Sequence, residues 1–309
     1  MSPNNCLVVL GPTASGKTKM AASLALELDA EIISADSRQV YRQLNIGTGK
    51  DLAEYRFHEK TVPVHLLDLA DPEEQFYLHD FIAALQRAFI AICERTKIPI
   101  ICGGTGLYLD ALEKNFELTQ IPENESLRRE LATLSSTELR ARLSAYSSEH
   151  TSQVDLHSAK RLIRGIEIAE HLCQHGLRPK KFVSPYHPLY IGIASDRDTR
   201  CAKIEARLRQ RFSEGLIEEA EQLLAGGLSN ERLQRLGLEY KFLSLYLSGK
   251  ITRNELEQQL LTAIQQFAKR QMTWFRKMER SGIKIHWVPA EYKTEQLIEL
   301  IKKESSLLG

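Results

Sequence analysis

The sequence predicts an α/β protein in which a parallel β-sheet is flanked by helices and interrupted by a helical insertion. Short apolar segments alternate with helical segments through the first 118 residues. Residues 119–184 then contain helical stretches without a convincing strand, and a strand pattern returns at residues 190–194. We therefore expect a core formed by residues 1–118 and 185–309, with a helical insertion domain at residues 119–184.

The elements of the core follow from apolar runs and helical periodicity. Apolar runs bounded by turn residues predict strands at residues 6–10, 31–35, 62–69, 98–102 and 190–194, with an edge strand at residues 284–288. Helical patterns predict helices at residues 18–28, 78–95, 199–225, 239–247, 253–278 and 295–304. This alternation is typical of a parallel sheet that is covered on both faces.

The composition is that of a globular protein with an apolar core. Of 309 residues, 43% are hydrophobic and 26% are charged, and the net charge of +1 argues neither for nor against a nucleic-acid partner. The apolar runs are far shorter than the roughly 18 residues that span a membrane, and the N-terminus lacks a signal-peptide pattern. The five cysteines are scattered, which disfavours disulfides and a zinc site. We expect a cytoplasmic monomer without membrane contact.

The segment between the first strand and the first helix matches G-x-x-x-x-G-K-S/T without a mismatch. Such a loop turns backbone N–H groups around phosphate oxygens, and the following helix adds a partial positive charge. The fold class is therefore P-loop NTPase-like. The motif predicts nucleotide or other phosphate binding, with ATP or GTP as the default, and Thr18 as a Mg²⁺ ligand. The predicted binding residues are Gly11, Pro12, Thr13, Ala14, Ser15, Gly16, Lys17 and Thr18.

Two further segments follow predicted strands, where ligands bind in an open α/β sheet. Asp36 ends the second strand and precedes the polar residues 37–41, so its carboxylate could accept a proton or hold a metal; it could equally cap a turn. Residues 103–108 contain three glycines after the fourth strand. They allow a close approach by a ligand or form a tight turn, and the sequence does not choose between these two.

Basic residues gather in two predicted helices. The first group lies at helical spacing on one face and consists of Arg200, Lys203, Arg207 and Arg211. Residues 260–284 hold six basic residues, with Trp274 and Phe275 among them. Basic side chains with aromatic neighbours suit a polyanion with exposed bases, whereas an amphipathic helix would bury Trp274. We expect both: the aromatic side chain faces inward and the charges face outward.

These motifs, taken in order, resemble the tRNA dimethylallyltransferase family, also called the tRNA isopentenyltransferase family, in its shorter bacterial form. The resemblance covers nearly the whole chain. It is carried by the segments at residues 11–18, 36–41, 46–50, 68–72, 103–108, 237–241 and 268–276. The phosphate loop alone is common to many families, whereas this combination is specific.

The resemblance implies transfer of a dimethylallyl group from dimethylallyl diphosphate to N6 of adenosine 37 in tRNA. It implies Asp36 as general base, Lys17 and Arg207 as catalytic residues at the diphosphate, and Mg²⁺ at Thr18. The insertion domain would contact the anticodon stem-loop. The implied tRNA-binding residues are Asp36, Ser37, Arg38, Gln39, Thr105, Lys160, Arg161, Arg164, Lys269 and Arg270.

The chain also departs from the family pattern, and other functions share its phosphate loop. Asp155 to Ser158 replace a Pro-Asn-Asp-like turn, and Gly165 stands where Ala is usual, which costs a helix about 1 kcal/mol. The alternatives are a nucleotide kinase with residues 119–184 as its lid, a prenyl transferase for free AMP, ADP or ATP, and a non-catalytic RNA-binding NTPase. The segment after Asp36 and the late basic helix favour the tRNA enzyme.

Overall fold

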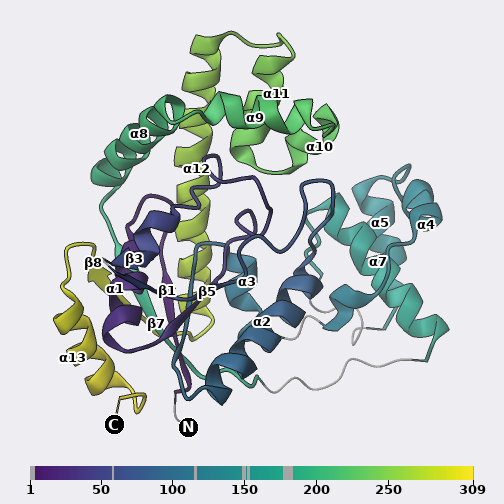
Figure 1. Ribbon diagram of the computed structural model, residues 1–309. Coiled ribbons are helices and arrows are strands. Elements are labelled where there is room, and N and C mark those ends of the chain that lie inside the picture. Colours follow the sequence, from purple (N-terminus) through teal and green to yellow (C-terminus); the bar gives the residue numbers. More distant parts are fainter. Residues whose placement is uncertain are drawn as a thin grey trace. The chain divides into compact units, whose positions relative to one another are not determined.

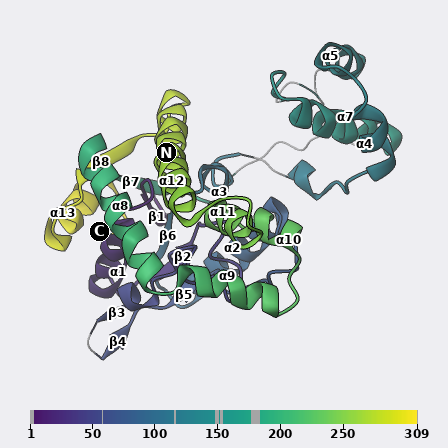
Figure 2. The same ribbon diagram turned by 90° about the horizontal axis from the view of Figure 1, so that it is seen from above.

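The computed structural model describes residues 4–57, 59–114, 117–147, 151, 154–176 and 184–308. The chain forms two compact units, Met1–Glu113 with Pro185–Gly309, and Lys114–Ser184. The second unit begins five positions before the expected residue 119, because the chain leaves the first unit directly after the turn that follows helix α3 (Gly106–Asp110). Figures 1 and 2 show both units.

The first unit is built on a sheet of six parallel strands in the order β5-β2-β6-β1-β7-β8. The strands are β1 (Cys6–Leu10), β2 (Glu31–Ser34), β5 (Val64–His65), β6 (Pro99–Gly103), β7 (Pro188–Ala194) and β8 (Ile285–Pro289). All five residues of β1 are fully buried, as expected for a central strand covered on both faces. The predicted α/β fold class and the edge strand are confirmed.

Helices cover this sheet. The helices α1 (Lys17–Glu27) and α13 (Thr294–Glu304) share a core cluster with Leu7 and Val9 of β1, whereas α2 (Leu78–Glu94) packs on β2 and β6. The pattern in α13 is amphipathic, and its buried Leu297 and Ile301 are one turn apart. The carboxyl ends of the strands are thus left to the loops that form the site.

A second hydrophobic cluster is made by the helices that follow β7, which lie together in green in Figure 1. They are α8 (Arg197–Ser213), α9 (Leu216–Ala225), α10 (Asn230–Arg235), α11 (Leu238–Leu247) and α12 (Arg253–Arg280). The prediction of one helix over residues 199–225 was wrong, because Gly215 adopts φ +100° and separates α8 from α9. Val40, Tyr41 and Leu44, from the segment after Asp36, are buried in the same cluster.

Other differences lie between β2 and α2. The strand predicted at residues 62–69 shrinks to β5, since Leu66 and Asp68 have positive φ angles of 66° and 54° that break an extended chain. A short 3-10 helix η1 (Leu52–Tyr55) and a hairpin of β3 (Arg56–Phe57) and β4 (Lys60–Thr61) were not predicted. Two-residue strands carry too little pattern to be recognised in a sequence.

The second unit has its own small core. It contains η2 (Glu117–Gln120), α4 (Glu125–Leu131), α5 (Ser136–Ser144) and α7 (Ala159–Gln174), and its described residues include no strand. Six buried residues from α4, α5 and α7 pack together. Gly165 of α7 faces Val154: a Cβ at this glycine would lie 2.7 Å from a Val154 methyl carbon, so the expected cost in helix propensity accompanies close packing.

Membrane insertion was not expected from the sequence. Within the part of the chain that the structure describes, every helix is too short or too polar to cross a bilayer.

Candidate active site

A cavity of about 580 Å³ opens where β1, β2 and β6 end. Its walls come from the loops after these strands and from α8, α11 and α12, all within the first unit. The structure brings together residues that the sequence analysis selected from distant segments. Those that line the cavity are Thr13, Lys17, Thr18, Asp36, Ser37, Arg38, Gln39, Thr105, Arg207, Arg211, Arg270 and Trp274, together with Gly103, Gly104, Gly106 and Leu107 of the glycine-rich turn.

The phosphate loop has the geometry that its sequence predicts. Gly16 has φ +85°, a conformation that favours glycine, and α1 begins at the next residue. Five of the eight predicted residues do not line the cavity: Gly11, Pro12, Ala14, Ser15 and Gly16. Ser15 is 1% exposed, and a Cβ at Gly11 would lie 2.6 Å from its hydroxyl. These five residues therefore shape the backbone of the loop.

Lys17 brings a cation to the floor of the cavity. Its ammonium group donates to the Pro12 carbonyl at 3.4 Å. Burial lowers the pKa of Lys17 below its ordinary value, and the nearby Asp36 carboxylate opposes this effect. An anion bound here would stabilise the charged form of the lysine.

Asp36 lies in the loop that follows β2 and faces the same cavity. Its carboxylate accepts the backbone N–H of Arg38 at 2.9 Å, a local turn that leaves the second carboxylate oxygen for a ligand. The Ser37 N–H donates to the Thr105 hydroxyl at 3.1 Å, which ties this loop to the glycine-rich turn after β6. Asp36 therefore caps this turn and also faces the cavity, so the two interpretations of this residue do not exclude each other.

The glycine-rich turn is close to other protein segments as well as to the cavity. A Cβ at Gly103 would overlap the backbone of Ala35, and one at Gly106 would overlap the indole of Trp274. Trp274 faces inward as predicted, but the core does not enclose it: its half-buried ring lines the cavity, whereas Phe275 and Met278 of α12 are buried. The indole fits at this wall because Gly106 has no side chain.

Gln271 is a site residue that the sequence analysis missed. It is 7% exposed, accepts the Thr13 N–H at 2.8 Å and donates to the Gly104 carbonyl at 2.9 Å. Its amide therefore joins α12 to the phosphate loop and to the turn after β6. The available signal was a polar residue on the buried face of a helix, where an unpaired amide would be costly.

Two arginines of α8 form the positive wall. Arg207 donates to the Asp51 carboxylate at 2.8 Å and to the Gly49 carbonyl at 3.4 Å, while Arg211 donates to the Gly47 carbonyl at 3.3 Å. Burial, with Arg207 as a second cause, lowers the pKa of Arg211. Two adjacent guanidinium groups suit a multivalent anion. Of the four basic residues predicted on this face, Arg200 and Lys203 do not line the cavity.

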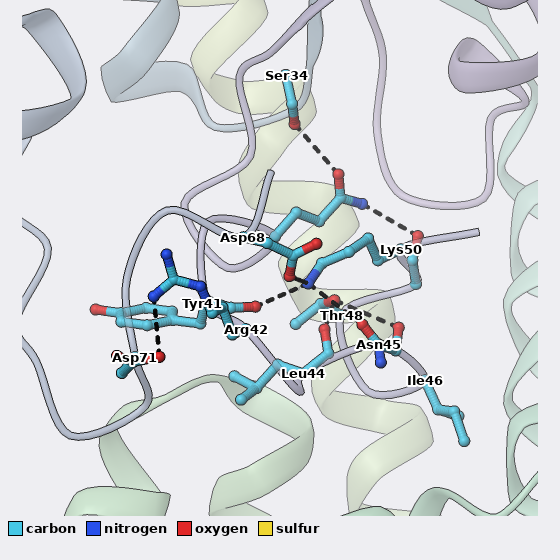
Figure 3. A network of polar contacts seen from close by, with 12 residues as sticks. Ser34, Tyr41, Arg42, Leu44, Asn45, Ile46, Thr48, Lys50, Asp68 and Asp71 are labelled. Carbon is cyan, nitrogen blue, oxygen red and sulfur yellow. Dashed lines mark hydrogen bonds and ion pairs between the residues drawn. The ribbon is translucent and has the colours of Figure 1, made fainter. Parts of the chain in front are cut away.

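The loop between Gln39 and Lys50 is held by a polar network. The buried Lys50 ammonium donates to the Tyr41 carbonyl at 2.8 Å and to Asn45 Oδ1 at 3.3 Å, and it pairs with Asp68 (Figure 3). Gln39 bonds through its amide to the Ser34 hydroxyl at 3.2 Å and to the Gly49 carbonyl at 3.1 Å. The network fixes this loop, whose Gly47 and Gly49 carbonyls accept hydrogen bonds from Arg211 and Arg207.

Glu54 of η1 is a second carboxylate near the phosphate loop, and the sequence analysis did not select it. Burial raises the pKa of Glu54, with Asp51 as the next cause, and opposing contributions come from Arg207, Lys17 and a hydrogen bond with Thr18. The described residues contain no cluster of three His, Cys, Asp or Glu side chains able to hold a metal. Thr18 and Glu54 nevertheless offer the oxygen donors that Mg²⁺ prefers.

The remaining predicted cations divide by unit. In the first unit, Arg38 and Arg270 are exposed and line the cavity, whereas Lys269 is exposed elsewhere on α12. In the second unit, Arg161 pairs with Asp155 and Arg164 donates to the Ile121 carbonyl at 2.6 Å. The remaining member of this group, Lys160, is exposed.

The chain is similar to proteins of known families. A family model described as IPP transferase matches residues 39–278, and one described as isopentenyl transferase matches residues 4–66. The chain belongs to the IPP transferase family. A relative named tRNA dimethylallyltransferase 2 from Bacteroides fragilis is 46% identical over 98% of this chain and 99% of its own. Another of that name, from Trichlorobacter lovleyi, is 48% identical over 92% of each chain.

Solved structures agree with this assignment. The tRNA isopentenylpyrophosphate transferase of Bacillus halodurans is 33% identical, with a TM-score of 0.68 over 97% of this chain and 95% of its own. A eukaryotic dimethylallyltransferase acting on tRNA is 21% identical, with a TM-score of 0.77 over 96% of this chain and 78% of its own, and it supports the fold alone. The predicted resemblance and the predicted P-loop NTPase-like fold are confirmed.

Proposed function

We propose that this protein transfers a dimethylallyl group from dimethylallyl diphosphate to N6 of adenosine 37 in tRNA and releases diphosphate. The observation that carries this proposal is the convergence of the Asp36 carboxylate, Lys17 and Arg207 on one cavity. A base for the accepting amine and cations for a leaving group are then in the same site. The 46–48% identity to enzymes named tRNA dimethylallyltransferase supports the choice of substrates.

The leaving diphosphate is assigned to the phosphate loop and α8. As the bond between the allylic carbon and oxygen breaks, negative charge develops on the diphosphate. Lys17, Arg207 and the N-terminus of α1 supply positive charge at this end of the cavity. Fixed donors of this kind bind the transition state, in which the leaving diphosphate has gained negative charge, more strongly than they bind the intact substrate. They therefore lower the barrier.

The adenine amine is a poor nucleophile because its lone pair is delocalised into the ring. Its N–H becomes acidic as the new carbon–nitrogen bond forms, and Asp36 can accept that proton. The target base must leave the stack of the anticodon loop to reach a carboxylate inside a cavity. Ser37 and Gln39 lie in the Asp36 loop, and Thr105 accepts a hydrogen bond from it; these three residues line the cavity and are assigned to contacts with the tRNA near that base.

Mg²⁺ fits the donors at the end of the phosphate loop. The Thr18 hydroxyl and the Glu54 carboxylate are neighbouring hard oxygen ligands, and Mg²⁺ commonly takes only one or two protein ligands together with phosphate oxygens and water. When bound, the ion would neutralise part of the diphosphate charge. Lys17 and Arg207 do so from the protein side.

RNA contacts are assigned to cations in both units, all of them exposed except the half-buried Arg164. Arg38 and Arg270 lie at the cavity of the first unit and Lys269 lies on the same helix as Arg270. The second unit would bind the anticodon stem-loop by charge and shape through Lys160, Arg161 and Arg164. We assign the protein to the cytoplasm as a monomer without membrane contact.

Labelled dimethylallyl diphosphate incubated with the protein and either unmodified tRNA or AMP tests this function. Label in tRNA is the expected result. Label in AMP alone would instead identify an adenylate prenyl transferase. Phosphorylation of a nucleotide by ATP, or ATP hydrolysis without any transfer of label, would identify a kinase or an RNA-binding NTPase.

A further inference from the structure

Glu219 of α9 is a buried carboxylate that does not line the cavity, yet it binds the loop that does. Glu219 is only 8% exposed. Oε2 accepts the backbone N–H groups of Asn45 and Ile46, both at 2.8 Å, and Oε1 accepts the Gly47 N–H at 2.9 Å. Oε1 also accepts the Tyr240 hydroxyl at 2.7 Å. Four donors thus converge on a single carboxylate.

This arrangement resembles an anion bound in a backbone nest, with the anion supplied by the protein itself. Successive N–H groups that point inward form a concave site for negative charge, and hydrogen bonds to an ionised acceptor are stronger than neutral ones. Tyr240 is fully buried and closes the other side. A Cβ at Gly47 would lie 2.6 Å from the Tyr240 hydroxyl oxygen, so the loop can come this close to Tyr240 only with glycine at position 47.

The same loop presents its carbonyl groups to α8. Gly47 accepts a hydrogen bond from Arg211 and Gly49 accepts one from Arg207, the two guanidinium groups of the positive wall. A Cβ at Gly49 would overlap both guanidinium groups, which shows how closely they flank the loop. A shift of residues 45–49 would therefore move the partners of both arginines.

We propose that Glu219 is a positioning residue for the diphosphate: it fixes residues 45–47, and through the Gly47 and Gly49 carbonyls it sets the orientation of Arg207 and Arg211. This inference rests on the proposed function, which assigns the leaving diphosphate to the phosphate loop and to α8, the helix that carries both arginines. It predicts that loss of Glu219 weakens diphosphate binding far more than RNA binding. A residue that only stabilised the fold would affect both substrates alike.

Glu219→Gln keeps the size of the side chain but replaces one acceptor oxygen by an amide that cannot accept a hydrogen bond. Tyr240→Phe removes one donor and leaves the three backbone contacts in place. Glu221→Gln, an exposed carboxylate of the same helix, is the matched control. Each variant is assayed for the inhibition constant of inorganic pyrophosphate, the KM of dimethylallyl diphosphate and the Kd of unmodified tRNA. Circular dichroism establishes that each protein is folded at the assay temperature.

We expect Glu219→Gln to raise the pyrophosphate inhibition constant and the KM of dimethylallyl diphosphate about tenfold, on the scale of one lost charge-assisted hydrogen bond. Tyr240→Phe should raise them about threefold, since a neutral donor contributes less. The tRNA Kd should stay within about twofold of wild type, and Glu221→Gln should match wild type.

A folded Glu219→Gln protein that binds pyrophosphate as wild type does would overturn the inference, and so would an equal loss of pyrophosphate and tRNA binding. If Glu219→Gln does not fold, Tyr240→Phe decides: unchanged pyrophosphate binding rejects the role of Glu219. Failure of the proposed function looks different. Wild-type protein would then bind pyrophosphate without transferring a prenyl group, and direct pyrophosphate binding by the variants would still test Glu219.

Discussion

The guanidinium group of Arg207 lies 2.8 Å from the Asp51 carboxylate, at the wall of the cavity where the diphosphate is assigned. Both side chains are partly exposed, so their ion pair adds little to stability. An incoming diphosphate and Asp51 would compete for the same cation. The ion pair should therefore weaken binding of the diphosphate.

Replacement of Asp51 by Asn should tighten diphosphate binding. Without the carboxylate, Arg207 is available to the ligand, and the KM of dimethylallyl diphosphate should fall about two- to fivefold, the range of one exposed ion pair. Steady-state kinetics at low and high salt measure this effect, which should shrink at high salt. A higher KM would mean that Asp51 orients Arg207 and does not compete for it.

Replacement of Asp36 by Asn should abolish most of the catalysis while leaving the substrates bound. The amide cannot accept the proton of the adenine amine, so kcat should fall by about 10²–10⁴. Pyrophosphate binding, measured by calorimetry, should change little. Transfer at the wild-type rate by the folded variant would remove Asp36 from the reaction.

Pyrophosphate binding should weaken at high pH because burial lowers the pKa of Lys17. The charged ammonium is present below this lowered pKa and is lost as pH rises through it, before a free lysine with its ordinary pKa of 10.5 would lose its proton. Lys17→Arg should bind pyrophosphate without this loss of affinity at high pH, since a guanidinium stays charged. Calorimetric titrations between neutral pH and pH about 10 compare the two proteins. If Lys17→Arg lost affinity over the same pH range, the titrating group would not be Lys17.

Replacement of Gly106 by Ala should destabilise the protein by about 1–3 kcal/mol, the usual cost of overpacking a well-packed site. The new methyl group would overlap the Trp274 indole. Urea unfolding measures the loss, and Trp274→Ala in the same protein should relieve much of it. Additive losses in the double variant would show that the two positions do not oppose each other.

The sequence was most informative where one local pattern determines a feature. The buried run of β1, the phosphate loop and the strand-end position of Asp36 were all predicted, because periodicity and loop chemistry are local. The break at Gly215 escaped prediction because helical spacing continues on both sides of it. A single glycine inside such a pattern is compatible with a helix as well as with a break.

The supporting residues of the site could not be predicted in the same way. Gln271 bonds to Thr13 across 258 positions, and Glu219 bonds to Gly47 across 172. Their chemistry is ordinary until the fold brings the partners together. The place of Trp274 at the cavity wall escaped prediction for the same reason, since tertiary packing decides the space beside Gly106.

The hydrogen bond between Thr13 and Gln271 also has a consequence for synthesis of the protein. A ribosome delivers the phosphate loop first and α12 near the end, so the loop spends most of translation without the amide that holds it. The central strand β1 likewise waits for β7, whose residues 188–194 follow the second unit. That unit is built from local helix contacts and can fold as it emerges. A nascent chain cut short before α12 would carry the phosphate-binding motif without a complete site.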